Sequence, residues 1–350
     1  MKTGRVTMRD VAARANVSKT AVSLAFNDSS RLSESTLQHI LATASEMGYA
    51  QDPAARMLRT RRTNSLGLLL PQQLDRVLEN PYYSQFLQGV GQTCNQEGYT
   101  LLLAPPLRGS MLKSIPYAAV DGFIVSGLEY DRGEVSALRQ RGIPFVLVDS
   151  EEHEGVASVE IDDAAGMETL VRHLLDLGHR QIGIAALETG DEGPWESWRG
   201  PVLRRMQGAV AALRAGGIDV DAPGIHVVQV ACTREGGKSA FDELWSAPER
   251  PTAIVAFSDV IALGVLDAAK QAGVAVPADL SVTGFDDLTE AQWSQPSLTT
   301  VRQPIASKGR LAAEFLVEAI AADEGAVTRR QHRLHTTLLV RESAAAPRPA

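Results

Sequence analysis

Apolar residues recur at helical spacing through the first fifty residues and in short β-rich runs over the rest of the chain. Met8, Val11, Ala12 and Ala15 share one face of a predicted helix, and Thr7 is typical of its N-cap because an acid follows three residues later. Further helical patterns follow Ser18 and Ser33, and a glycine ends the last one. We expect three short helices around one small core.

The first two of these helices are joined by a tight turn at Asn16-Val17. Ala21, Val22 and Ala25 form the inward face of the second helix. Its outward face carries the polar, basic and apolar side chains of Lys19, Thr20, Ser23 and Leu24. Two short helices in this arrangement predict a helix-turn-helix, whose second helix fits the major groove of DNA.

From residue 65 onward, apolar runs alternate with amphipathic stretches. The runs are LGLLL (66–70), TLLLA (100–104), GFIVSG (122–127), FVLVD (145–149), QIGIAAL (181–187), VVQV (227–230), AIVAFSD (253–259) and LSVTGFD (280–286). This alternation predicts the α/β class, with two doubly wound subdomains of parallel strands and crossover helices. A ligand is expected between them, at the carboxyl ends of the strands.

Two aspartates close predicted strands in this region. Asp149 ends FVLVD and Asp259 ends AIVAFSD. A carboxylate at such a position can accept hydrogen bonds from two hydroxyls, as a sugar presents them, or it can cap the following helix. The residues alone leave both roles open.

Charge divides the chain in the same way as the apolar pattern. Residues 1–62 hold ten Lys and Arg against five acids, a net charge of +5, while the remaining residues carry −13. A small cationic unit before a large anionic one favours contact with nucleic acid, although a solvated basic helical face would show the same charge.

A short helical pattern follows the third helix. Asp52 precedes Pro53 at the first helical position, and Leu58 and several arginines follow. A helix this short is marginal in water, so we expect it to be disordered alone and to form on DNA. An ordinary polar linker is the alternative.

Residues 6–63 resemble the DNA-binding headpiece of the LacI/GalR repressor family, through VTMRDVAARANVSKTAVSLAFNDSSRLSESTLQHI and the segment that follows it. The resemblance continues to about residue 342, through IDDAAGMETLVRHLLDLGHRQIGI, PTAIVAFSDVIALGVLDAAKQAGVAVPADLSVTGFDD and QPSLTTVRQPIASKGRLAAEFL. It implies a helix-turn-helix headpiece with a hinge helix, then two α/β subdomains of periplasmic-binding-protein type.

The resemblance also implies which residues contact DNA. Lys19, Thr20 and Ser23 would face base edges, with Leu24 in place of a base-reading arginine and able to contact only a thymine methyl. Phosphate contacts would come from Thr7, Ser18, Asn27 and Arg31. In the hinge, Ala55, Leu58 and Arg59 would contact DNA, with Leu58 inserted between the central base pairs.

The effector residues implied by the family are Tyr82, Tyr83, Asp149, Arg205 and Asp259. The tyrosines are otherwise core or interface aromatics, and Arg205 a surface helix residue. Cys232 stands where many members have an aromatic side chain that stacks on the effector, so we expect Trp195 or Trp198 to supply that face. The stretch 101–125 is shorter than in the family, which predicts a trimmed N-terminal subdomain.

The sequence contains none of the common catalytic or metal motifs. Gly236-Gly237-Lys238-Ser239 lacks the first glycine of a phosphate-binding loop, and His173 and His179 are expected in surface or capping roles. Cys94 and Cys232 are expected to be reduced and inert. We predict no enzyme activity, no cofactor and no metal.

Since no apolar run approaches ~20 residues and the N-terminus lacks a signal-peptide core, we expect a cytoplasmic protein without membrane contact.

These patterns and the family resemblance together predict a ligand-responsive repressor, and the resemblance implies that it controls carbohydrate genes. Its parts are a headpiece (1–50), a hinge helix and linker (51–63), an effector-binding and dimerisation domain (64–342) and a disordered tail (343–350). Its partners are a palindromic DNA duplex, a second copy of the chain and a small effector, a sugar or phosphosugar. A solute-binding sugar receptor without a regulatory role is the alternative.

Overall fold

The computed structural model describes residues 6–27, 29–50, 57, 62–128, 131–150, 153–189, 193–322 and 330–348. The chain forms two compact units, Met1–Thr63 and Asn64–Ala350, and each is considered by itself. None of the helices in the described ranges is both long and apolar enough to cross a membrane.

The first unit contains α1 (Met8–Arg14), α2 (Lys19–Asn27), the 3-10 turn η1 (Ser29–Arg31) and α3 (Glu34–Glu46). Its helix ends follow from local capping. Thr7 and Asp10 form a reciprocal capping box on α1, and Ser33 accepts a hydrogen bond from the backbone N–H of Thr36 at the start of α3. The core consists of Val11, Ala12, Val22, Ala25, Ile40 and Ala44, so the predicted three-helix core is confirmed.

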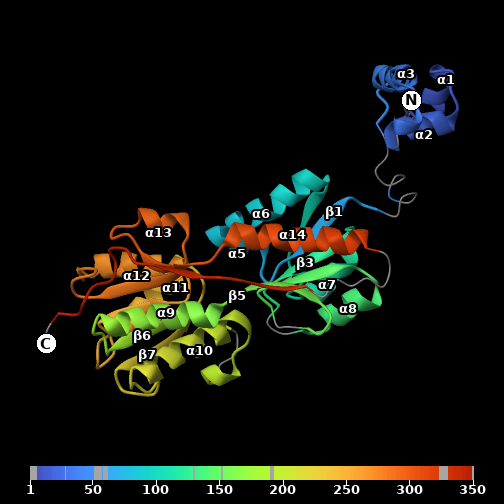
Figure 1. Cartoon of the computed structure of the whole chain (residues 1–350). Helices are drawn as coiled ribbons and strands as arrows, with labels where there is room; N and C mark the ends of the chain where they lie inside the picture. Colours follow the sequence, from blue (N-terminus) through green and yellow to red (C-terminus); the bar gives the residue numbers. More distant parts are fainter. Residues whose placement is uncertain are drawn as a thin grey trace. The chain divides into compact units, whose positions relative to one another are not determined.

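The second unit contains two sheets that form two subdomains (Figure 1). The N-terminal subdomain has the strand order β11-β5-β4-β3-β1-β2, all parallel. These strands are β1 (Ser65–Leu69), β2 (Thr100–Ala104), β3 (Gly122–Ser126), β4 (Phe145–Val148), β5 (Ala157–Ile161) and β11 (Gln331–Leu334). Its helical segments are α5 (Leu74–Glu79), α6 (Pro81–Glu97), α7 (Met111–Ser114), η2 (Ile115–Tyr117), α8 (Glu134–Gln140) and α14 (Ile305–Ala321).

The C-terminal subdomain has the strand order β12-β10-β9-β8-β6-β7, in which only the β12–β10 pairing is antiparallel. Its strands are β6 (Ile182–Leu187), β7 (Ile225–Val230), β8 (Ala253–Ala256), β9 (Ser281–Asp286), β10 (Thr299–Arg302) and β12 (Thr337–Leu339). Its helical segments are α9 (Asp163–Asp176), η3 (Trp195–Ser197), α10 (Gly200–Ala215), α11 (Arg234–Trp245), α12 (Asp259–Gln271) and α13 (Thr289–Trp293).

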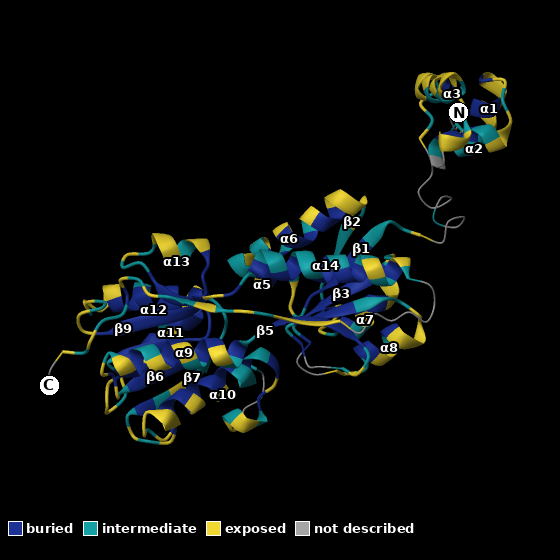
Figure 2. Ribbon diagram, viewed as in Figure 1, coloured by how far each residue is buried: buried dark blue, intermediate teal, exposed yellow. Residues whose placement is uncertain are grey.

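Helices cover both faces of each sheet, which explains why most of the central strands read as continuous apolar runs (Figure 2). Leu66, Leu68 and Ile124 pack toward α6 and α14, whereas Leu69 and Phe123 pack toward α7 and α8. Between β2 and β3 the crossover contains only α7 and η2. The short stretch noted in the sequence therefore yields two short helical turns, α7 and η2, in place of a full crossover helix.

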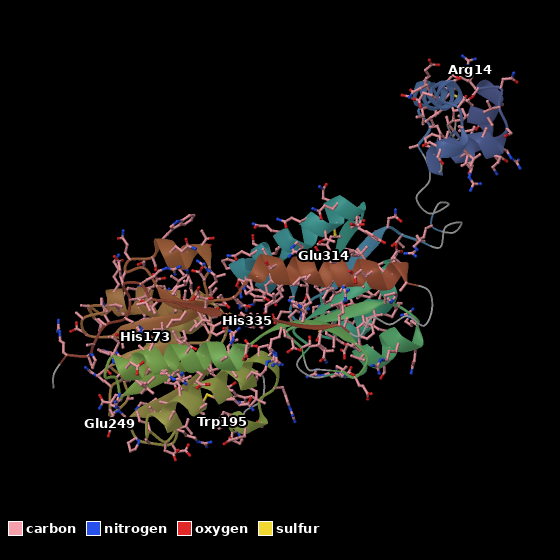
Figure 3. The ribbon with its side chains drawn as sticks, in the orientation of Figure 1. Arg14, His173, Trp195, Glu249, Glu314 and His335 are labelled. Atoms are coloured by element: carbon pink, nitrogen blue, oxygen red, sulfur yellow. The ribbon has the colours of Figure 1, made fainter. Side chains whose placement is uncertain are left out.

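The chain passes between the subdomains where β5 leads to α9, where β10 leads to α14, and where β11 leads to β12. Figure 3 labels Glu314 on α14 and His335 on the last of these connections. As a result α14, which follows the second sheet in sequence, packs beside α6 in the N-terminal subdomain (Figure 1). Side chains from distant parts of the sequence thus meet near these connections.

The predicted disordered tail is wrong for residues 343–348. Ser343 is fully buried and donates a hydrogen bond to the carbonyl of Val282 at 2.6 Å. The carbonyl of Ala345 lies 2.9 Å from Nε2 of His179. Of the two roles expected for His179, surface or capping, the surface position is wrong because the side chain is buried. These partners are distant in sequence, so no local pattern signals that the tail docks.

Two glycines let α6 and α14 pack at close range. A Cβ on Gly89 would lie 1.8 Å from the carbonyl oxygen of Ala306, and a Cβ on Gly309 would lie 2.2 Å from that of Phe86. A Cβ on Gly91, also in α6, would meet nothing within 4 Å. The two glycines of α6 therefore differ in surroundings, although they share the same helix.

We expect Gly89→Ala to lower the free energy of unfolding of the second unit by about 2–3 kcal/mol, because the helices must separate. Gly91→Ala, the matched control, should raise it by about 0.5–1 kcal/mol through helix propensity alone. Urea denaturation followed by circular dichroism measures both. Equal effects of the two substitutions would show that close packing of α6 on α14 is unimportant.

Candidate functional site

The outward face of α2 in the first unit carries the predicted base-reading residues. Lys19 and Thr20 are exposed, and Ser23 and Leu24 are half-buried. Ser18 accepts a hydrogen bond from the backbone N–H of Ala21 at 3.0 Å, so its hydroxyl oxygen caps the start of α2. Val22 and Ala25 hold the opposite face in the core.

Thr7 and Arg31 flank this helix in different ways. The hydroxyl of Thr7 donates to Oδ2 of Asp10 at 2.7 Å and lowers the pKa of that carboxyl, so the Thr7 side chain is engaged in capping. Arg31 is exposed at the end of η1. The side chain of Asn27 and the hinge residues Ala55, Leu58 and Arg59 lie outside the described residues, so their predicted DNA contacts remain predictions.

In the second unit, a chain of polar side chains connects the carboxyl ends of strands in both subdomains. We call it the polar cluster: Tyr82, Asp149, Ser258, Asp286, Gln303 and Lys308. On the N-terminal side, Tyr82 Oη donates to Asp149 Oδ2 at 2.7 Å and Lys308 Nζ donates to the same oxygen at 2.6 Å.

The chain continues into the C-terminal subdomain. Lys308 Nζ also donates to Gln303 Oε1 at 2.6 Å, and Gln303 Nε2 donates to Asp286 Oδ1 at 2.5 Å. Ser258 Oγ donates to Asp286 Oδ2 at 2.8 Å. Gln303 lies on the connection from β10 to α14, so the polar cluster runs along a passage between the subdomains.

Burial and neighbouring charges give the two cluster carboxylates opposite pKa shifts. Burial alone would raise the pKa of Asp149, but the adjacent Lys308 ammonium and the Tyr82 hydroxyl bring it below its ordinary value. Burial raises the pKa of Asp286 above its ordinary value, although Arg205 and the hydrogen bond from Ser258 oppose that effect. Asp149, Asp286 and Asp287 all have positive φ, of 49°, 134° and 59°, at these strand ends.

Arg205 is buried beneath the polar cluster and is not a surface helix residue. Its Nε donates to Asp163 Oδ1 at 2.9 Å, one Nη donates to the carbonyl of Phe257, and the guanidinium lies 3.8 Å from the centre of the Phe285 ring. Arg204 Nε donates to Asp163 Oδ2 at 3.2 Å. The predicted contact of Arg205 with effector oxygens therefore competes with three protein contacts.

Asp259 is fully buried, and both of its oxygens are already engaged. Oδ1 accepts from the Thr300 hydroxyl at 2.6 Å, and Oδ2 accepts from the backbone N–H of Leu288 at 2.8 Å. Gly284 makes room for it, because a Cβ there would lie 2.2 Å from Oδ1. Burial and the nearby Asp286 raise the pKa of Asp259 to about 8. In this conformation Asp259 ties α12 to the neighbouring strands and does not offer a free oxygen to a ligand.

The predicted aromatic residues lie in different subdomains, the tyrosines on α6 and the tryptophans at and just after η3. Tyr83 packs edge to face on Tyr82, with ring centres 5.3 Å apart. Trp198 is 2% exposed within the α9–α10 core, and Trp195 packs against that core from η3, before α10 (Figure 3). The structure therefore encloses Trp198 and does not present its ring as a stacking face.

Cys232, which stands at the family's aromatic position, lies between the subdomains. Its Sγ accepts a hydrogen bond from Asn80 Nδ2 at 3.5 Å, and it packs against the N-terminal subdomain core. Burial raises the pKa of its thiol to about 11, so the group is protonated at neutral pH. Cys94 is buried, and burial raises the pKa of its thiol as well.

Several buried polar atoms near these residues lack a hydrogen-bond partner among the described parts of the chain. They include Asp149 Oδ1, Arg204 Nη2 and Trp198 Nε1. Buried polar atoms are nearly always paired, and a bound ligand is one way to satisfy such an orphaned atom. Within the described ranges, no group of three or more His, Cys, Asp or Glu side chains is placed to hold a metal ion.

Lys308, Gln303, Asp286 and Asp163 were not predicted as site residues from the sequence. One signal was present, because Lys308 interrupts the apolar face of α14 between Ile305 and Ala312. A lone lysine on a buried stripe requires a counter-charge. The pattern could not show that this counter-charge is Asp149, far away in sequence.

Comparison with known proteins identifies families and relatives that share this architecture. Residues 7–52 match the model of bacterial regulatory proteins of the lacI family, and residues 171–344 match the periplasmic binding protein-like domain. The HTH-type transcriptional regulator Rv3575c of Mycobacterium tuberculosis is 35% identical, over 90% of this chain and 91% of that protein. The HTH-type transcriptional repressor PurR of Escherichia coli O139:H28 is 34% identical, over 90% of each chain.

A solved structure shows the same fold. It is a complex of the transcriptional regulator CelR with cellobiose, 29% identical, with a TM-score of 0.71 over 97% of this chain and 100% of that chain. The predicted combination of an N-terminal helix-turn-helix with two parallel-sheet subdomains is confirmed.

Proposed function

This chain belongs to the lacI family of bacterial regulatory proteins, and on that premise we propose that it is a cytoplasmic repressor that binds a palindromic operator as a dimer and responds to a sugar. The observation that carries the proposal is the presence, on one chain, of a capped helix-turn-helix and a two-subdomain domain with orphaned polar atoms at its strand ends. Its relatives are named transcriptional regulators, and none of the names quoted above is that of an enzyme.

The proposed DNA contacts are those of the outward face of α2. Lys19 and Thr20 are free to reach base edges, with Ser23 and Leu24 beside them. Phosphate contacts would come from Thr7, Ser18, Asn27, Arg31 and Arg59, while Ala55 and Leu58 would act in the minor groove. The negative second unit, at −13 beyond residue 62, disfavours DNA contact elsewhere.

The proposed effector site comprises the polar cluster with Tyr83, Arg205 and the surrounding strand ends. Asp149 Oδ1 can accept a hydrogen bond and Arg204 Nη2 can donate one, and a sugar hydroxyl satisfies both kinds of group. The cellobiose complex of CelR, at 29% identity, supports a carbohydrate. Asp259 would contribute indirectly, through the strands it joins, and Trp195 remains the better placed tryptophan for a contact because Trp198 is enclosed.

The sugar proposal is tested by a thermal-shift screen with pentoses, hexoses, disaccharides, their phosphates and nucleosides. We expect at least one uncharged sugar to raise the melting temperature of the second unit and to change the affinity for a DNA duplex selected from a random library, by about 5- to 150-fold. Stabilisation without any change in DNA affinity would instead favour a solute receptor, which is the second candidate. Light scattering of the protein with DNA gives the number of copies bound.

Lys19→Ala should weaken binding to the selected duplex by about 5- to 150-fold, because a base-edge contact of this kind is worth ~1–3 kcal/mol. Lys270→Ala, an exposed lysine at the end of α12, is the matched control and should leave the affinity unchanged. Fluorescence anisotropy over a range of salt concentrations measures both. Equal affinities of the two variants would contradict DNA recognition by α2.

A further inference from the structure

Lys308 is a fully enclosed cation. It lies on the face of α14 that also buries Ile305, Ala312 and Leu316, and its exposed fraction is 0%. Burying an ammonium group is costly unless a counter-charge and hydrogen bonds compensate it, and an apolar side chain of similar volume would often be at least as stable. Its presence at this position therefore calls for a role beyond packing.

All three partners of Lys308 belong to the polar cluster. Nζ lies 2.6 Å from Asp149 Oδ2, 2.6 Å from Gln303 Oε1 and 3.3 Å from Tyr82 Oη. Nζ also lies 5.4 Å from the centre of the Tyr82 ring, which adds a cation–π contact. The ammonium thus has a partner for each of its three protons.

These contacts engage only one of the two carboxylate oxygens of Asp149. Tyr82 and Lys308 both hold Oδ2, while Oδ1 is buried and lacks a partner among the described residues. The backbone at Asp149 has a φ of 49°, which any residue other than glycine adopts rarely. One oxygen of the carboxylate is therefore anchored and the other remains available as an acceptor.

We propose that Lys308 is a positioning residue of the effector site: it holds Asp149 as an oriented carboxylate whose free oxygen accepts a ligand hydroxyl or N–H, and it links that carboxylate through Gln303 to Asp286 in the C-terminal subdomain. This inference rests on the proposed function, since it assumes a ligand at the strand ends. It identifies the ligand group at Asp149 as a hydrogen-bond donor.

Loss of Lys308 has a definite electrostatic consequence. Burial is the largest influence on the pKa of Asp149, and without the ammonium it would act with much less opposition and raise that pKa. The charged or titratable groups that act on Asp149 or stand next in the cluster are Lys308 from α14, Tyr82 from α6, Arg204 and Arg205 from α10, and Asp286 from β9. Arg204 and Arg205 are already paired with Asp163, so neither replaces Lys308 directly.

Ligand-free melting curves between pH 5.5 and 8.5 test the ion pair. In Lys308→Met, Asp149 takes up a proton in the folded state, so the melting temperature should fall relative to wild type as the pH rises. In Asp149→Asn, the buried ammonium loses its counter-charge, so the melting temperature should lie below that of wild type. The double variant should recover stability and follow the wild-type profile.

A Lys308→Met profile parallel to that of wild type, or a slope that persists in the double variant, would overturn the proposal. Lys308→Arg keeps the charge and should retain the wild-type profile, and Lys270→Met controls for loss of an exposed lysine. If Lys308→Met does not fold, the loss of stability in Asp149→Asn and its recovery in the double variant still decide the matter.

The ligand role is tested by titrating the same variants with cellobiose. We expect Lys308→Met to bind cellobiose at least tenfold more weakly than wild type at pH 8, and Lys308→Arg to stay within threefold. Equal affinities of wild type and Lys308→Met at pH 8 would overturn the proposal. A wild-type protein that ignores cellobiose and every sugar in the screen would instead contradict the proposed sugar effector, and the melting profiles would still show whether Lys308 keeps Asp149 charged.

Discussion

Arg205→Ala should lower the free energy of unfolding of the second unit by about 3–5 kcal/mol, because it leaves the Asp163 carboxylate buried without its main counter-charge. The Asp163 side chain has an exposed fraction of 0%, and Arg205 supplies the shorter of its two ion pairs, at 2.9 Å. The substitution also removes the donor to the Phe257 carbonyl and the contact over the Phe285 ring. Guanidinium chloride denaturation followed by circular dichroism measures the loss.

Arg234→Ala is the matched control for this prediction. Arg234 pairs with Asp267 at 2.8 Å, but their side chains are 51% and 42% exposed, so its loss should cost about 0–1 kcal/mol. If Arg205→Ala destabilised no more than Arg234→Ala, Arg204 alone would suffice for Asp163, and Arg205 would be available for ligand binding at little structural cost.

The stability of the second unit should fall by roughly 2–4 kcal/mol between pH 5 and pH 8, and Asp259→Asn should remove most of that fall. The folded pKa of Asp259 is about 8, far above its ordinary value of 3.8. Between these pH values the folded state holds a proton that the unfolded state releases. This contribution to stability is therefore complete below about pH 4 and is lost as the pH rises through 8.

An asparagine at position 259 can keep both hydrogen bonds without a charge. Its carbonyl can accept from the Leu288 N–H, and its amide can donate to the Thr300 hydroxyl, which also accepts. Asp267→Asn is the control, because it removes an exposed carboxylate from the same helix. Denaturation curves at several pH values test this prediction, which fails if the two variants show the same profile.

Features decided by neighbouring residues could be predicted from the sequence. The capping box of Thr7 and Asp10 and the cap at Ser33 involve atoms three residues apart, so the headpiece helices begin where the pattern places them. The strands β1, β3, β4, β6, β8 and β9 are largely buried and were visible as apolar runs because both faces of each sheet are covered, and the edge strands β2 and β7 were visible as apolar runs as well. Strands with mixed composition were missed, such as β5 with Glu160 and β11, which pairs Gln331 with Ser158.

The sequence by itself determined the helix-turn-helix, the two α/β subdomains and the division of charge, because caps, periodicity and composition are local properties. Only the tertiary structure decided that Asp149 pairs with Lys308, that Asp259 has no free oxygen, that Trp198 is enclosed and that residues 343–348 dock beside His179. Each of these depends on contacts between segments far apart in the chain. Their energies come from burial and from charges brought together by folding, which no local pattern contains.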